Sequence, residues 1–219
     1  MAPKCIIFDC DGTLVDSEYL TNSVIAKMAG ELGVKMTAEE ATATFGGKTL
    51  DAVIYGMKER SGKELPPEWL PRLVKKVSDA YKKDLRAMDG IDRVLEYISI
   101  PVCVASNGQP KHVEGSLTVT NLIDYFEDNI FTASDVGIPK PAPDLFLYAA
   151  EKMKFKPEEC VVIEDSIAGV TAAVRANIKV YGLIKMCSAE ELEKAGAIPF
   201  NSMAELPDLL GLKWIGIIN

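Results

Sequence analysis

Residues 4–13 have the sequence Lys-Cys-Ile-Ile-Phe-Asp-Cys-Asp-Gly-Thr, and this stretch decides the fold class. Its apolar run, residues 5–8, stops abruptly at a turn signal that begins at Asp9 and ends at Gly12. A short, continuous apolar run bounded by a turn is typical of a parallel strand buried on both faces. We therefore predict a buried strand that ends in two carboxylates, those of Asp9 and Asp11.

Similar apolar runs recur much later in the chain. They lie at 102–105, 160–163 and 180–184, with a weaker one at 129–131, and helical patterns at 143–153, 166–176 and from Ser188 onward separate them. Alternation of strands and helices favours right-handed crossovers and a parallel sheet covered on both faces. The sequence thus predicts an α/β fold with a Rossmann-like parallel sheet core.

Residues 17–86 differ from the rest of the chain because they contain no convincing strand pattern. Helical patterns cover 51–60 and 67–85, and the spacing of Thr37 and Glu40 is that of a capping box. We expect a small all-α unit, residues 17–86, inserted after the first strand, with 1–16 and 87–219 as the α/β core.

The composition narrows the class of protein. The 219 residues carry a formal net charge of −8, with five cysteines and one histidine. No basic stripe offsets this charge, so we expect no nucleic-acid partner. No run approaches the roughly 18 apolar residues of a membrane helix, and no apolar leader precedes the first strand, so we expect a cytoplasmic protein. The cysteines lack Cys-x-x-Cys spacing and are expected to be reduced.

Polar side chains follow three of the predicted strands, in the pairs Asp9 and Asp11, Ser106 and Asn107, and Glu164 and Asp165. The carboxyl ends of parallel strands converge on one crevice, so these groups should meet in space. Two carboxylates about 4 Å apart repel by about 4 kcal/mol at an effective dielectric near 20. A divalent cation relieves that repulsion, and an oxygen-only donor set favours Mg²⁺. The alternative is that these acids only cap helices.

Two further segments are candidates for binding an anion. Ser106 precedes Asn107-Gly108, so its hydroxyl and the nearby backbone N–H groups are suited to a phosphate, although the tripeptide also fits a plain turn. Lys140 lies between Pro139 and Pro141, which hold its backbone extended. It is a candidate to neutralise a phosphoryl oxygen, and the alternative is a solvated surface lysine.

The segment Asp9-Cys10-Asp11-Gly12-Thr13 resembles the Asp-x-Asp-Gly-Thr signature of the haloacid dehalogenase superfamily. Ser106, Lys140 and Glu164-Asp165 follow in the order of that family's remaining motifs, so the resemblance covers essentially the whole chain. The helical insert, residues 17–86, resembles the small cap of subfamily I, which implies that 1–16 and 87–219 form the catalytic core. Among its members the chain is similar to the β-phosphoglucomutase-like branch, which includes sugar-phosphate and 6-phosphogluconate phosphatases.

The resemblance implies a role for each motif. Asp9 would be the nucleophile that forms an aspartyl-phosphate, and Asp11 the general acid and then the general base. Mg²⁺ would be held by Asp9, by the backbone carbonyl of Asp11 and by Asp165, with Glu164 as a ligand or a partner of the ligands. Ser106 and Lys140 would bind phosphoryl oxygens, assisted by Asn107. The implied function is a Mg²⁺-dependent phosphatase of a small sugar or sugar-acid phosphate.

The cap loop at 45–49 corresponds to the loop that carries substrate specificity in subfamily I, which makes Gly47 and Lys48 candidates for substrate binding. Related phosphoglucomutases have an arginine in this loop, whereas here Leu50 follows it. A β-phosphoglucomutase-type reaction therefore remains an alternative, and a binding protein without activity is a weaker one. A small-molecule phosphate ester is the expected partner, and the protein is expected to be a monomer or a weak homodimer.

Three residues outside the motifs are expected to have no catalytic role. His112 lies in a polar stretch and is expected to be exposed, whereas Trp69 and Trp214 are expected to pack in the interior.

Overall fold

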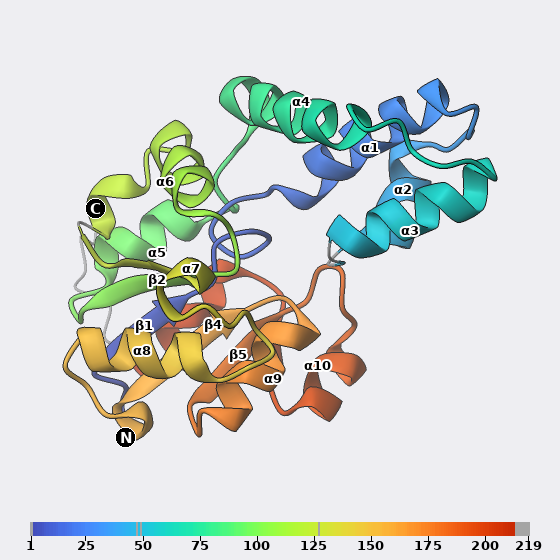
Figure 1. Ribbon diagram of the computed structural model, residues 1–219. Coiled ribbons are helices and arrows are strands. Elements are labelled where there is room, and N and C mark those ends of the chain that lie inside the picture. The colour runs from blue at the N-terminus through green and yellow to red at the C-terminus, as the bar shows by residue number, and fades with distance from the viewer. Residues whose placement is uncertain (1, 47, 49, 127, 213–219) are drawn as a thin grey trace. The chain divides into compact units, whose positions relative to one another are not determined.

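A computed structural model describes residues 2–46, 48, 50–126 and 128–212 (Figure 1). The chain divides into two compact units: Asp16–Arg86 forms one, and the segments on either side of it form the other. The larger unit contains a six-stranded sheet, and the smaller unit contains helices.

The sheet has the strand order β3-β2-β1-β4-β5-β6, and every neighbouring pair is parallel. The six strands are β1 (Cys5–Phe8), β2 (Val102–Ser106), β3 (Ile130–Thr132), β4 (Cys160–Glu164), β5 (Lys179–Leu183) and β6 (Ile198–Phe200). β1 lies between β2 and β4, with Ile7 in register with Cys103 on one side and Val162 on the other. The predicted α/β fold with a parallel Rossmann-like sheet is confirmed.

Helices cover both faces of the sheet (Figure 1). Those of the larger unit are α5 (Ile91–Tyr97), α6 (Pro110–Val119), α7 (Ala133–Val136), α8 (Asp144–Lys152), α9 (Ile167–Arg175), α10 (Ala189–Ala195) and α11 (Leu206–Leu209), with short 3₁₀ turns at Ile123–Tyr125, Pro157–Glu159 and Met203–Glu205. Phe146 of α8 and Val170 of α9 belong to the same buried core as Cys5 and Ile7 of the central strand. Since successive strand residues point to opposite faces, Phe8 packs on the other side, edge-on to the ring of Phe126.

One strand was not predicted. β6 is only three residues long, has Pro199 in the middle and pairs along one side with β5. Proline cannot donate to a sheet ladder, so it is confined to edge strands, and its presence weakens the local strand pattern. The predicted strands at 129–131 and 180–184 are present within a residue of their expected bounds, as β3 and β5.

The smaller unit contains the helices α1 (Glu18–Glu31), α2 (Ala38–Phe45), α3 (Leu50–Ser61) and α4 (Trp69–Asp84). Their apolar faces share one core, with Met28 on α1, Phe45 on α2, Met57 on α3 and Trp69 on α4. Trp69 is fully buried, which confirms its predicted packing role, whereas Trp214 lies outside the described residues. The shared cluster gives this small unit a core of its own. Full burial of each large apolar side chain in it stabilises the unit by about 1.5–3 kcal/mol.

A capping box formed by Thr37 and Glu40 marks the start of α2. The backbone N–H of Thr37 donates to Glu40 Oε2 at 2.7 Å, and the backbone N–H of Glu40 donates to Thr37 Oγ1 at 3.1 Å. These two bonds satisfy donors that the first turn of a helix leaves unpaired, which confirms the capping box.

The chain leaves the larger unit and returns to it at adjacent points. Val15 and Ala87 form an antiparallel bridge, and the N–H of Asp16 donates to the carbonyl of Arg86 at 2.9 Å. The two ends of the helical unit are therefore hydrogen bonded to each other.

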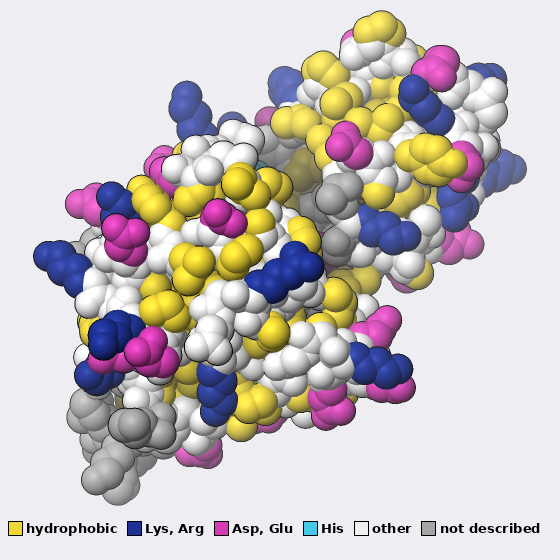
Figure 2. Space-filling model, turned by 60° about the horizontal axis from the view of Figure 1, so that its bottom comes forward, with side chains coloured by type: hydrophobic (Ala, Val, Ile, Leu, Met, Phe, Trp, Pro, Cys, Tyr) yellow, Lys and Arg dark blue, Asp and Glu magenta, His cyan; other side chains and the backbone are white. Residues whose placement is uncertain are grey.

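On the face drawn in Figure 2, Lys and Arg side chains are interspersed with Asp and Glu side chains. Four cysteines, Cys5, Cys10, Cys103 and Cys160, are buried free thiols. Within the described residues, every helix is too short or too polar to cross a bilayer.

Candidate active site

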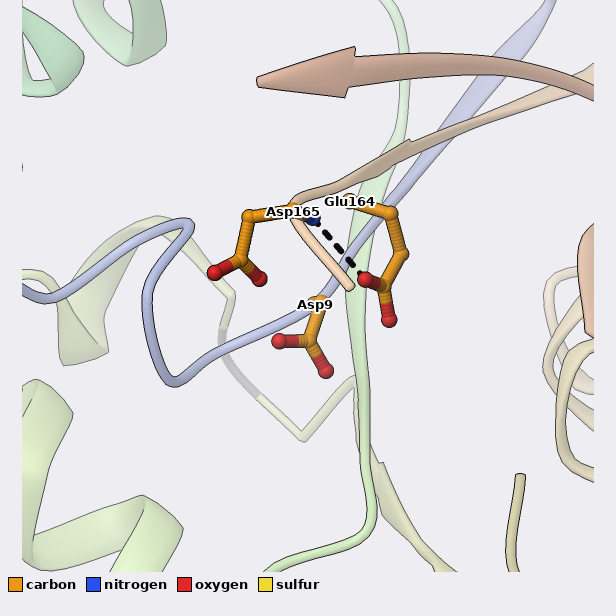
Figure 3. A group of neighbouring side chains, drawn as sticks. All are labelled: Asp9, Glu164 and Asp165. Carbon is orange, nitrogen blue, oxygen red and sulfur yellow. Dashed lines mark hydrogen bonds between the residues drawn. The ribbon is translucent and has the colours of Figure 1, made fainter. Parts of the chain in front are cut away.

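Three carboxylates meet at the carboxyl end of the sheet (Figure 3). Asp9 directly follows β1, Glu164 is the last residue of β4, and Asp165 follows it. Because β1 and β4 are neighbours in the sheet, side chains about 155 positions apart end side by side. One oxygen from each of the three lies within 4.8 Å of the others, and all three residues are buried.

The position of Asp9 has an electrostatic cost. Burial raises the pKa of Asp9 above its ordinary value, and the carboxylates of Glu164 and Asp11 add to that effect, while Lys140 opposes it. A carboxylate in such a place is a strong acceptor for a cation, since removal from water disfavours its charge.

Lys140 supplies a positive charge to this cluster. Its Nζ atom lies 2.6 Å from Asp9 Oδ1 and 2.9 Å from Glu164 Oε1, and its side chain is 3% exposed. Burial alone would lower the pKa of Lys140, but the carboxylates of Asp9 and Glu164 outweigh burial and raise it. The alternative of a solvated surface lysine is therefore wrong. The ammonium group of Lys140 thus neutralises charge on two of the three carboxylates, those of Asp9 and Glu164.

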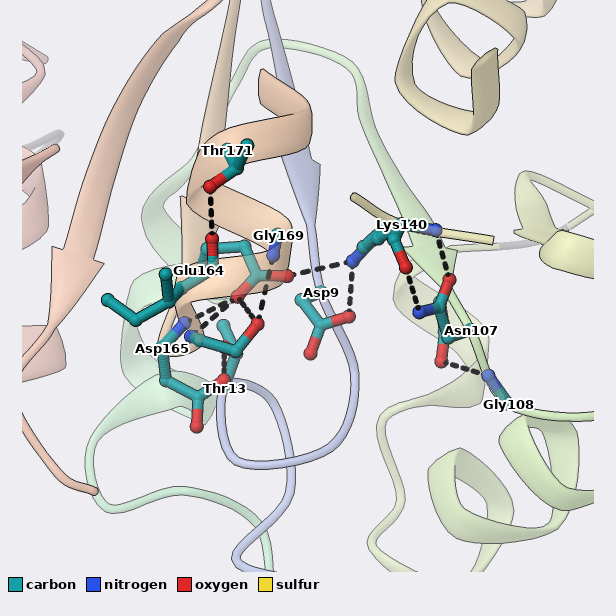
Figure 4. A network of polar contacts seen from close by, with 12 residues as sticks. Asp9, Thr13, Asn107, Gly108, Lys140, Glu164, Asp165, Gly169 and Thr171 are labelled. Carbon is teal, nitrogen blue, oxygen red and sulfur yellow. Dashed lines mark hydrogen bonds and ion pairs between the residues drawn. The ribbon is translucent and has the colours of Figure 1, made fainter. Parts of the chain in front are cut away.

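The backbone of Lys140 is held by Asn107 (Figure 4). Asn107 Oδ1 accepts a hydrogen bond from the Lys140 N–H at 2.9 Å, and its Nδ2 donates to the Lys140 carbonyl at 3.3 Å. Arg175 of α9 adds a bond of 3.0 Å from Nη1 to the carbonyl of Pro141. These bonds fix the loop between α7 and α8 that presents the ammonium group.

Glu164 is held as firmly as Lys140. Its Oε2 accepts from the backbone N–H groups of Asp165 and Ser166, at 2.9 and 2.7 Å, and from Ser166 Oγ at 2.9 Å. Gly169, in the first turn of α9, gives this carboxylate its space, because a Cβ atom there would overlap Glu164 Oε1. Glu164 thus spends both oxygens on hydrogen bonds within the protein.

The turn after β1 fits closely around Asp165. Gly12 has φ of +84°, a conformation that favours glycine, and a Cβ atom at this position would overlap Asp165 Oδ2. Thr13 Oγ1 donates to Asp165 Oδ1 at 3.2 Å. The Gly-Thr pair of the motif therefore orients the carboxylate that ends the neighbouring strand.

Asp11 is partly exposed and lies beside this cluster rather than within it. Among the described residues, its side chain does not belong to the group of carboxylates within 4.8 Å. Ser106, at the end of β2, is buried, and its Oγ accepts from the N–H of Gly108 at 3.0 Å.

The expectation of an exposed His112 is wrong, because the residue is half-buried beside Asp11. His112 is the third residue of α6, its side chain is 34% exposed, and its Nε2 lies 3.5 Å from Asp11 Oδ2. The signal in the sequence is Pro110, which is typical of a first helical turn and therefore places His112 close to the end of β2.

The two predicted substrate-binding residues of the helical unit are described only in part. Lys48 is exposed, and its N–H donates to the carbonyl of Phe45 at 3.0 Å. Gly47 lies outside the described residues. Their role in substrate binding stays a prediction.

Comparison with known proteins assigns the family. The sequence profile of haloacid dehalogenase-like hydrolases matches residues 6–183. The chain is 29% identical over 207 residues to the 6-phosphogluconate phosphatase of Escherichia coli (strain K12), which covers 94% of each chain. A haloacid dehalogenase-like protein of unknown function from Agrobacterium tumefaciens str. C58 has a TM-score of 0.87 and 30% identity, covering 95% of this chain and 97% of that one.

A second solved structure extends the comparison. A HAD family hydrolase from Deinococcus radiodurans R1, with bound phosphate and sodium, has a TM-score of 0.85 and 30% identity over 96% of both chains. The extent of these matches agrees with the order of motifs that starts at Asp9. The chain therefore belongs to the haloacid dehalogenase-like hydrolases.

Proposed function

We propose that this protein is a Mg²⁺-dependent phosphatase that hydrolyses a small sugar or sugar-acid phosphate through an aspartyl-phosphate on Asp9. The observation that carries the proposal is the buried pair of Asp9 and Lys140 beside Glu164 and Asp165. Similarity to a 6-phosphogluconate phosphatase supports the substrate class.

The donor set fits a divalent cation. All the ligand atoms are oxygens, and the three carboxylates are buried with one oxygen of each within 4.8 Å of the others. Hard cations such as Mg²⁺ prefer these ligands. We assign Asp9, Asp165 and the backbone carbonyl of Asp11 as the residues that would hold it. Glu164, whose oxygens accept four hydrogen bonds, would serve mainly to fix Lys140.

The first half of the reaction uses Asp9 and Asp11. A carboxylate oxygen of Asp9 attacks phosphorus, the bond from phosphorus to the ester oxygen breaks, and Asp11 gives its proton to that oxygen, so that the alcohol leaves neutral. Lys140 and Ser106 bind the non-bridging oxygens, where negative charge accumulates. Bound Mg²⁺ would offset the repulsion between the anionic ester and Asp9.

The second half reverses these roles. A water molecule gives a proton to Asp11 while its oxygen attacks phosphorus, and the bond between phosphorus and Asp9 breaks. Inorganic phosphate leaves, and both carboxyl groups return to their starting protonation states. The same two residues thus serve both half-reactions.

We take residues 17–86 as a cap, with Gly47 and Lys48 as candidates for substrate contact. A cytoplasmic location and a monomeric or weakly dimeric state also stay predictions.

Phosphate release from a panel of metabolites tests the proposal. The panel contains 6-phosphogluconate, hexose 6-phosphates, 2-deoxyglucose 6-phosphate, phosphoglycolate and β-glucose 1-phosphate, each with Mg²⁺ and with EDTA. We expect release from one or a few esters with Mg²⁺, loss of release in EDTA, and no turnover by a folded Asp9→Asn variant. Conversion of β-glucose 1-phosphate to the 6-phosphate without release would instead indicate a mutase, and full activity in EDTA would exclude the metal.

A further inference from the structure

His112 stands on a rigid part of the molecule. Pro110 begins α6, the N–H of His112 donates to the Gln109 carbonyl at 2.9 Å, and the next residue, Val113, is fully buried. A Cβ atom added at Gly108 would lie 3.4 Å from His112 Cδ2, an ordinary contact distance, so the imidazole lies beside the loop that follows Ser106. A side chain on such an element can hold a partner in one orientation.

The imidazole of His112 contacts Asp11. Nε2 of the imidazole lies 3.5 Å from Oδ2 of Asp11, and the two side chains have similar exposure, 34% and 30%. The distance is longer than that of a strong hydrogen bond, as is common for catalytic contacts before substrate is bound. Within the described part of the chain, the other oxygen, Oδ1, is buried and has no hydrogen-bond partner. The contact with His112 therefore constrains Oδ2 of Asp11, while no hydrogen bond from the described residues constrains Oδ1.

We infer that His112 is a positioning residue for Asp11: its Nε2–H holds Oδ2 and thereby fixes the plane of the carboxyl group that exchanges the proton with the ester oxygen. This inference rests on the proposed phosphatase reaction. Proton transfer depends on the direction of the donor as well as its distance, so a carboxyl group that rotates freely is a poorer general acid. The imidazole itself contributes no proton to the reaction.

The fall in rate on loss of His112 should depend on the basicity of the leaving group. An alkoxide from a sugar is a strong base, so the break between phosphorus and its oxygen needs the proton from Asp11. p-Nitrophenolate is a weak base and leaves without one. Loss of His112 should therefore slow the cleavage of alkyl phosphates much more than that of p-nitrophenyl phosphate.

The test compares kcat/KM, which covers the steps through alcohol release, for 6-phosphogluconate and p-nitrophenyl phosphate. If 6-phosphogluconate is not hydrolysed, the best sugar phosphate of the panel takes its place. For His112→Ala we expect a fall of about 10- to 100-fold on the alkyl ester and less than about threefold on the aryl ester. His112→Gln, which keeps an N–H donor, should recover part of the loss.

A double-mutant cycle shows whether His112 acts through Asp11. Addition of His112→Ala to Asp11→Asn should cause no further loss, because the group that is positioned is already gone. Lys111→Ala, an exposed neighbour on the same helix, is the matched control and should leave both reactions unchanged. An equal fall on both esters, or the full loss repeated in the Asp11→Asn background, overturns the inference.

The contact can also be tested without activity. His112 is the only histidine, so its imidazole Cε1–H gives a single, self-assigned proton NMR signal. In metal-free protein at a fixed pH, Asp11→Asn should shift this signal, and Lys111→Ala should not. An unmoved signal overturns the contact even in an active enzyme. A wild-type protein that hydrolyses no ester, with the signal shift intact, overturns the phosphatase proposal and with it the role in catalysis.

Discussion

The Nζ atom of Lys140 lies 2.6 Å from Oδ1 of Asp9, although 131 positions separate the two residues. This ion pair is buried, and its ammonium group also contacts Glu164. Removal of one partner leaves the other charges uncompensated in the interior, at a cost of about 3–5 kcal/mol.

Lys140→Met should therefore lower the free energy of unfolding by about 3–5 kcal/mol and abolish measurable phosphate release. Urea denaturation measures the first effect and steady-state kinetics the second. Lys152→Met, an exposed lysine on α8, is the control and should change stability by no more than about 0.5 kcal/mol. A Lys140→Met protein as stable as the control would contradict the buried ion pair.

Gly169→Ala should inactivate the protein even though alanine is a better helix former by about 1 kcal/mol. The new methyl group would overlap Glu164 Oε1, so the carboxylate must leave Lys140 and the N–H groups that bind it. We expect a fall in kcat of at least about tenfold and a lower melting temperature. Gly115→Ala on α6, where a Cβ atom meets nothing within 4 Å, should be neutral or stabilising. Equal behaviour of the two variants would argue against a steric role for Gly169.

His112 should make stability depend on pH in a defined direction. Contact with the Asp11 carboxylate raises the pKa of His112 above its ordinary value, against the opposing effect of burial. A raised pKa means that the folded state holds this proton more tightly. The stabilisation is complete below the unfolded-state pKa of about 6.5 and is lost as pH rises through the folded-state pKa.

The measurement is a series of thermal melts of metal-free protein from about pH 5.5 to pH 9, for the wild type and for His112→Gln. The wild type should melt higher at the acid end, and the difference should vanish at the alkaline end. A difference of the same size at every pH would mean that packing, and not charge, links His112 to stability.

Mg²⁺ should stabilise the folded protein through Asp165. A ligand at about one hundred times its Kd adds about 2.7 kcal/mol, which for a chain of this size raises Tm by about 5–10 °C. We expect this rise in the wild type and its loss in Asp165→Asn, with Asp208→Asn, an exposed acid, as the control. An unchanged rise in Asp165→Asn would remove this residue from the metal site.

The sequence predicts much of the sheet because a buried parallel strand has a local signature. The run Cys5–Phe8 and the runs that form β2 and β4 are continuous apolar segments that end in turn residues, and the run that forms β5 is apolar apart from Gly182. The edge strand β6 lacks that signature, since Pro199 and its short length make it resemble a loop. Its place is determined by pairing with β5, which is a tertiary interaction.

The residues of the candidate site that lie at strand ends are predictable from the sequence, whereas the contacts made by its loops are not. Motif residues such as Asp9 and Asp165 are found because each follows a strand, and strand ends converge. The tie between Asn107 and Lys140 spans 33 positions and depends on the path of two loops, so no local pattern contains it. The contact of His112 with Asp11 is not predicted, because the polarity of the residues around His112 indicates solvent exposure, whereas one helical turn is enough to bring it to Asp11.

The N–H of Asp16 donates to the carbonyl of Arg86, next to the Val15–Ala87 bridge. The segment 16–86 therefore begins and ends at one point of the larger unit. Such an insertion is exchangeable: a segment of different length or sequence can replace it without changing how the strands of the sheet pair. The entropic cost of bringing the two ends of a replacement segment together grows only slowly with the length of that segment. If the helical unit is the proposed cap, specificity for a new ester can therefore be engineered at this junction without any change to the residues at the strand ends.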